Sequence, residues 1–264
     1  MQQSHSRNHH DFIRQLITLV AIVVSFGVNV ASNIFPLNGL SIGAISNTLF
    51  KDVLIIPANY AFVVWGLIYL GLFVLGGYQF LPQKKKDKDL RKIGYLLVIA
   101  CVAQSIWVYL FLSRLFALSV IAMLAILVPL IIIYRVLGSS KKRASSRKKL
   151  CLHTPVSIYL SWITVATVVN VACTLYFHGW NGWGINSQVW TMIMLVVATT
   201  ITTVIVIRYR DFAYTGVTIW ALIAIAIKHS NIEILMNLSI FLAVILMFIV
   251  IIQSWRNEEN STKK

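Results

Sequence analysis

The residues that could carry chemistry in this chain are mostly aromatic or neutral and polar. One group in the stretch 155–173 is spaced by 4, 3, 4, 4 and 3 residues, and its members are Pro155, Tyr159, Trp162, Ala166, Asn170 and Cys173. This spacing places them on one face of a helix. Aromatic rings can stack on a flat apolar molecule, and an amide can offer it a neutral hydrogen bond. The same face would also suit packing between helices, with Asn170 bonded across the interface. The pattern by itself favours packing.

Shorter stripes of the same kind occur earlier in the chain. They are Asn29 and Asn33, then Phe62, Trp65, Gly66 and Tyr69, and then Gln104, Trp107 and Phe111. An amide that faces lipid would lack hydrogen-bond partners, so we expect these stripes to face the interior of a bundle.

Ionisable groups provide no comparable pattern. All eight acidic residues are expected in tails or connections between apolar runs, and the histidines form no triad or metal-binding spacing. The three cysteines show no paired spacing that would predict a disulfide framework. We therefore expect no catalytic residues, no metal ligands and no required cofactor, which argues against an enzyme.

The composition indicates which elements must position the stripes. Hydrophobic residues make up 58% of the 264 residues, charged residues only 12%, and the mean hydropathy is +0.80. A soluble domain has about a quarter charged residues. The sequence thus predicts an all-α, polytopic integral membrane bundle of about eight transmembrane helices. The expected helices cover 12–35, 59–81, 93–112, 115–134, 155–177, 189–207, 212–227 and 234–255.

The net charge of +15 supports this helix count. With a cytoplasmic amino terminus, 20 of the 23 Lys and Arg residues fall on the cytoplasmic side, and only Lys51, Arg114 and Lys228 fall opposite. This is the positive-inside pattern, so the charge predicts both termini in the cytoplasm and no nucleic-acid partner. We expect the protein to lie in a plasma or inner membrane, with its first apolar segment, 12–35, as an uncleaved membrane anchor.

The stripes resemble motifs of the tryptophan-rich sensory protein, or translocator protein (TspO/MBR), family. Residues 159–170, YLSWITVATVVN, are similar to the fifth-helix signature of that family. Residues 57–69 resemble its second-helix motif, and Trp107 to Phe111 resembles its third-helix W-x-x-x-F. The resemblance covers about residues 12–178.

The resemblance implies a five-helix bundle that binds a porphyrin, a haem-like tetrapyrrole or a sterol-like molecule and has a sensory or regulatory role. The ligand-binding residues that it implies are Trp65, Tyr69, Trp107, Tyr159, Trp162, Ala166 and Asn170. The expected partners are the lipid bilayer, a hydrophobic small molecule and a second copy in a homodimer. In the family the loop that corresponds to 36–57 covers the pocket, so this segment is either a lid or an interfacial coil.

The chain also departs from the family pattern. Three further helices follow the fifth, so we divide it into a TspO/MBR-like region (1–180), an additional three-helix region (181–256) and a polar tail (257–264). Gln104 stands near the position where the family carries Asn in its third helix. Two other functions remain open: a carrier of a neutral hydrophobic solute, and a structural protein whose last helices dock a partner.

Overall fold

The computed structural model of the protein describes residues 2–84, 87–140 and 144–262. The helices are α1 (Gln2–Ile34), α2 (Ile42–Thr48), α3 (Val64–Tyr78), α4 (Lys88–Leu112), α5 (Phe116–Ser140), α6 (Ser146–Lys148), α7 (Thr154–Phe177), α8 (Ser187–Tyr209), α9 (Phe212–Lys228) and α10 (Glu233–Thr262). Short 3-10 turns cover Leu37–Gly39, Asn59–Val63, Pro82–Lys84 and Gly182–Gly184, and a π turn covers Lys149–His153. The predicted helical class is confirmed in the described residues, which contain no strand.

Seven helical segments among the described residues are long and apolar enough to cross a membrane, and one of them, Asn59–Tyr78, joins the 3-10 turn Asn59–Val63 to α3. The eighth apolar helix, α9, has 17 residues and would be about 25 Å long at about 1.5 Å per residue, which is shorter than the hydrocarbon core of about 30 Å. The predicted reversal near residues 112–114 is confirmed, because α4 ends at Leu112 and α5 begins at Phe116. Arg114 adopts a left-handed conformation there (φ 60°), and the amide of Leu115 donates to the carbonyl of Leu110.

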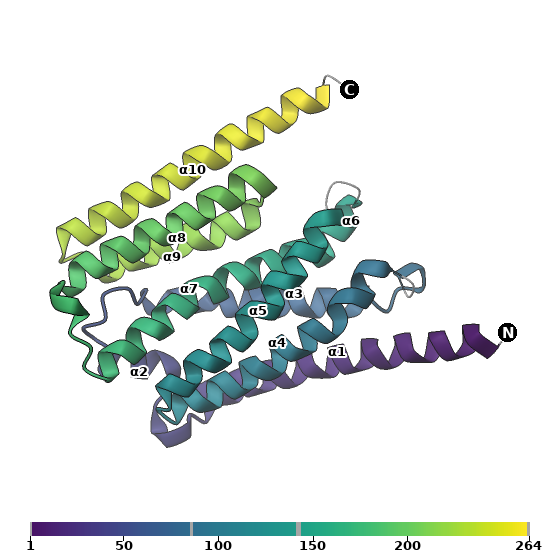
Figure 1. Ribbon diagram of the computed structural model, residues 1–264, viewed down its shortest axis with the longest axis horizontal. Coiled ribbons are helices and arrows are strands. Elements are labelled where there is room, and N and C mark those ends of the chain that lie inside the picture. The colour runs from purple at the N-terminus through teal and green to yellow at the C-terminus, as the bar shows by residue number, and fades with distance from the viewer. Residues whose placement is uncertain (1, 85–86, 141–143, 263–264) are drawn as a thin grey trace. The chain divides into compact units, whose positions relative to one another are not determined.

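The chain forms two compact units. The N-terminal unit contains residues 1–45 and 65–163, and the C-terminal unit contains residues 46–64 and 164–264. The boundary therefore falls within α2, at the start of α3 and within α7. In the N-terminal unit α4 packs against α1 and α5, and in the C-terminal unit α8, α9 and α10 pack against one another (Figure 1).

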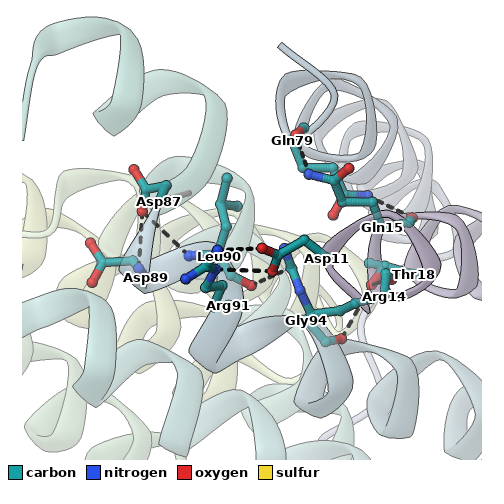
Figure 2. Close-up of polar contacts among 10 residues, drawn as sticks. All are labelled: Asp11, Arg14, Gln15, Thr18, Gln79, Asp87, Asp89, Leu90, Arg91 and Gly94. Atoms are coloured by element: carbon teal, nitrogen blue, oxygen red, sulfur yellow. Dashed lines mark hydrogen bonds and ion pairs between the residues drawn. The ribbon is translucent and has the colours of Figure 1, made fainter. Parts of the chain in front are cut away.

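A buried polar cluster joins the helices of the N-terminal unit (Figure 2). Arg14 of α1 is only 3% exposed, and its Nη1 donates to the carbonyl of Leu90 in α4 at 2.6 Å. Its Nη2 lies 3.6 Å from Oδ1 of Asp11, whose carboxylate also accepts two hydrogen bonds from Arg91. Because a buried charge is costly without a counter-charge, Asp11 is the group that makes this arrangement stable.

The neighbouring helix ends are tied together in the same way. The side chains of Gln15 and Gln79 each donate to the backbone carbonyl of the other residue, at 2.7 and 3.0 Å, which ties the first half of α1 to the end of α3 (Figure 2). Nζ of Lys148 in α6 lies 2.8 Å from Asp87 and 2.7 Å from Asp89 at the start of α4. The starts of α1, α4 and α6 therefore lie at one end of the N-terminal unit.

The expectation that every carboxylate lies in a tail or connection is wrong for Asp11, Asp89 and Glu233, because each falls inside a candidate membrane span. Asp11 belongs to α1 and falls inside the candidate membrane span His10–Ile34. The hydrophobic run, and with it the expected helix, begins at Phe12. The helix extends further because Arg14 and Arg91 neutralise the carboxylate, and hydrophobic periodicity does not detect such ion pairs.

The structure does not describe all of the basic residues that support the positive-inside pattern. Those outside the described residues are Lys85, Lys86, Lys141, Lys142, Arg143, Lys263 and Lys264.

Gly94 sets the distance between α1 and α4. A Cβ built on Gly94 would lie 2.9–3.0 Å from three atoms of the Arg14 side chain, which is held by its bond to Leu90. The Gly94→Ala variant is therefore expected to lose roughly 1–3 kcal/mol of stability through overpacking. Gly77→Ala is the matched control, because nothing lies within 4 Å of the added atom. That variant should be neutral or gain up to about 1 kcal/mol from helix propensity. Thermal unfolding in detergent measures both, and equal midpoints would contradict the prediction.

Candidate functional site

Trp65 of α3 is the centre of an aromatic cluster in the N-terminal unit. Its ring stacks on Tyr69 with centroids 5.9 Å apart, and it meets Tyr159 and Trp162 of α7 edge to face at 6.2 and 6.5 Å. The other three side chains are buried, whereas Trp65 is half-buried. Trp65 therefore keeps aromatic surface on which a further flat group can stack.

A close approach of α3 and α7 brings these rings together. A Cβ built on Gly71 would lie 2.9 Å from the Cβ of Pro155, so the two helices are almost in backbone contact at this point. Tyr69 is further fixed by its hydroxyl, which donates to the carbonyl of Ser25 in α1 at 3.1 Å. Three helices thus hold the cluster in one geometry.

Gln104 of α4 adds an unusual polar group beside this cluster. It is 1% exposed, and neither its Oε1 nor its Nε2 has a hydrogen-bond partner among the residues that the structure describes. Cys101, one helical turn earlier, is also buried. Each unpaired buried polar atom lowers the stability of the fold by about 1–3 kcal/mol. A polar atom of a ligand could pair with the amide and remove this cost.

The remaining predicted site residues are Trp107, Ala166 and Asn170. Trp107 of α4 is buried and packs against Phe111 with ring centroids 5.3 Å apart. Ala166 and Asn170 continue along α7 into the C-terminal unit. Asn170 is buried, and its carbonyl accepts a hydrogen bond from the hydroxyl of Thr174 at 2.8 Å. Four of the seven predicted residues, Trp65, Tyr69, Tyr159 and Trp162, are thus in direct ring contact.

The C-terminal unit contains a cavity that the sequence did not indicate. This apolar cavity has a volume of about 430 Å³ and lies between the end of α7, the start of α8 and the segment 52–55. Its wall includes Trp180 and Trp190. Their ring centroids lie 5.3 Å apart, and Nε1 of Trp190 donates to the carbonyl of Gly182 at 2.8 Å.

The segment 36–57 is not a coil along its whole length. It contains α2, and Phe50, Ile55 and Ile56 are buried. From residue 46 it belongs to the C-terminal unit, where the amide of Ala58 donates to the carbonyl of Ala224 in α9 at 3.1 Å. The hydroxyl of Tyr176 donates to Asp52 at 3.0 Å. These contacts hold the segment as one wall of the apolar cavity.

Helices of membrane-spanning length, packed around aromatic side chains with few buried charges, define the chain as a polytopic helical membrane protein. Its residues 15–252 match the family model described as TSPO-like protein. The chain belongs to the TSPO-like protein family. The match extends beyond the motifs at residues 57–170 and includes α8, α9 and most of α10. No curated protein and no solved structure matches the chain significantly.

The unpaired amide of Gln104 leads to a stability prediction. Replacing Gln104 with Leu removes two unsatisfied polar atoms at similar volume, so the variant should be as stable as the parent or more stable by about 1 kcal/mol. Gln79→Leu is the matched control, because Gln79 is equally buried but donates to Gln15, and its loss should lower stability by about 1 kcal/mol. Thermal unfolding of the two variants checks this contrast. A lower midpoint for Gln104→Leu would show that its amide is satisfied.

Proposed function

We propose that this membrane protein binds a flat hydrophobic ligand such as a porphyrin at the aromatic cluster around Trp65, and that binding serves a sensory or regulatory role. The observation that carries the proposal is the contact of Trp65 with Tyr69, Tyr159 and Trp162. These are residues of the motifs that resemble the TspO/MBR family, and they come from two helices far apart in the chain.

The chemistry of the cluster suits a macrocycle better than a small polar substrate. Trp65 offers a partly accessible ring for stacking, and the rings of Tyr159 and Trp162 are steeply inclined to it. Gln104 supplies a neutral donor and acceptor. Trp107, Ala166 and Asn170 complete the proposed ligand-binding set as the family resemblance implies it. None of these groups supplies a general acid, a base or a metal ligand, so we propose binding without a required cofactor.

The binding proposal is tested by titrating purified protein with protoporphyrin and following tryptophan fluorescence. Quenching should be saturable, and Trp65→Ala and Trp162→Ala should each weaken affinity by about tenfold, which corresponds to about 1.4 kcal/mol of lost stacking. The matched control is Trp183→Ala, because Trp183 is 77% exposed and lies in the C-terminal unit. Affinity that falls equally in all three variants, or in none, would count against the cluster as the site.

We further propose that both termini lie in the cytoplasm of a plasma or inner membrane. The starts of α1, α4 and α6 lie at one end of the N-terminal unit, where Arg14, Arg91 and Lys148 gather around Asp11, Asp87 and Asp89. This end carries the basic residues that the positive-inside rule assigns to the cytoplasm. Arg114 lies in the turn between α4 and α5, at the other end of both helices.

Native cysteines provide a test of this orientation. Cys151 is half-buried at the start of the α7 region, whereas Cys101 and Cys173 are fully buried. A membrane-impermeant maleimide should therefore label Cys151 only after the cells are permeabilised. In an Arg114→Cys variant the new thiol is exposed in the opposite turn and should be labelled in intact cells. Labelling of Cys151 in intact cells, and of the new thiol only after permeabilisation, would show that the orientation in the membrane is the opposite one.

A further inference from the structure

Two more cavities adjoin the apolar cavity of the C-terminal unit. An inner cavity of about 50 Å³ shares Ile55, Val168 and Met194 with it. A third cavity, of about 490 Å³, shares Asp52, Leu54 and Ser187 with it but shares no residue with the inner cavity. We call the third one the basic cavity. The shared walls place the three cavities in a row, with the apolar cavity in the middle.

The chemical character of the walls changes along this row. The inner cavity lies among aliphatic side chains of α7, α8 and α9. The apolar cavity is walled mainly by Val171, Ala172 and Leu175 of α7 and by Trp180 and Trp190. The basic cavity instead presents Lys51, Lys228, Gln188 and Asn231. A ligand that fills the row must be apolar over most of its length and polar at one end.

The polar end carries a local excess of positive charge. Lys228 is half-buried and its Nζ donates to Oδ1 of Asn47 at 3.3 Å, while Lys51 is exposed. Asp52 is the acidic residue in this wall, and its carboxylate accepts the hydrogen bond from Tyr176. Burial, and next the charge of Lys228, lower the pKa of His229, so this histidine is neutral at neutral pH. The wall of the basic cavity thus contains two lysines and one carboxylate.

The position of these lysines is also unusual in the sequence. Lys51 and Lys228 are two of the three basic residues that the helix order places on the non-cytoplasmic side. The positive-inside rule provides no reason for them to be there. Both occur in the wall of the same cavity, although 177 positions separate them (228 − 51). A role in binding an anion accounts for both.

We infer that the three cavities form one binding site for an elongated amphiphile with a negatively charged end. Its hydrocarbon chain would lie in the apolar and inner cavities, and its carboxylate or phosphate ester would lie between Lys51 and Lys228. The apolar cavity is within the range of about 300–1,000 Å³ that is usual for small-molecule sites. All of the wall residues belong to the C-terminal unit, so the site does not depend on porphyrin binding at Trp65.

The test uses a long-chain fatty acid that carries a photoreactive diazirine in its chain, added to the purified full-length protein in mildly alkaline buffer. Mass spectrometry of the irradiated protein should find the label on the α7–α8 segment, between Val168 and Met194. Oleate or oleoyl lysophosphatidate should suppress the labelling, and the stronger of the two identifies the charged group. Oleyl alcohol, which has the same chain and no charge, should compete about tenfold less well, since two ion pairs are lost.

Variants separate the site from general membrane partitioning. Lys51→Gln combined with Lys228→Gln should raise the oleate concentration needed for competition by about tenfold, whereas Lys228→Arg should retain the parent value. Arg114→Gln is the matched control, because it removes the third basic residue of the same side from the N-terminal unit. Thermal unfolding of each variant verifies its fold. Trp162→Ala should leave the labelling unchanged, which distinguishes this site from the proposed porphyrin site.

Three results would overturn the inference. They are label distributed over all apolar helices, equal competition by oleate and oleyl alcohol, and suppression of the label by protoporphyrin but not by oleate. The last result would assign the cavities to the tetrapyrrole instead of to a chain amphiphile.

Discussion

The buried guanidinium of Arg14 is the constraint around which the N-terminal unit is built. It is held by the carbonyl of Leu90 and faces the carboxylate of Asp11, while Gly94 leaves the space that its side chain occupies (Figure 2). A cation inside an apolar helix bundle is tolerated only with such partners, because desolvation costs several kcal/mol per ion. α1 therefore has one register against α4. The paired amides of Gln15 and Gln79 extend this register to α3.

The aromatic cluster depends on that register. Tyr69 donates to Ser25 of α1, so the position of α1 orients the ring on which Trp65 stacks. The close contact of Gly71 with Pro155 then brings Tyr159 and Trp162 to the other side of Trp65. Polar bonds at one end of the helices and small residues along them thus create the conditions for a rigid aromatic site. The C-terminal unit uses a different arrangement, in which chain segments and helix ends enclose space instead of filling it.

Much of the architecture follows from hydrophobic runs alone. Eight apolar segments, the reversal near Arg114 and the interior position of the stripe from Tyr159 to Asn170 were all predictable, because membrane helices must be long, apolar and satisfied internally. The start of α1 was not predictable, because Asp11 is expected in a polar tail as long as its arginine partners are unknown. For the site, the sequence identified the four clustered rings. It placed Gln104 in a stripe that faces the bundle interior but did not indicate that its amide is unpaired, because an unpaired amide is a property of its surroundings.

The sequence by itself determined that the chain is a helical membrane protein with aromatic faces, and it carried the motifs of the TSPO-like family. Those properties depend on local periodicity and composition, which act within single helices. Only the tertiary structure decided which polar groups pair, which remain unpaired and where cavities form. Lys51 and Lys228 are separated by most of the chain, and no pattern along it relates them. They occur in the wall of one cavity because the segment 46–64 packs against α9, a long-range contact that depends on packing between distant segments.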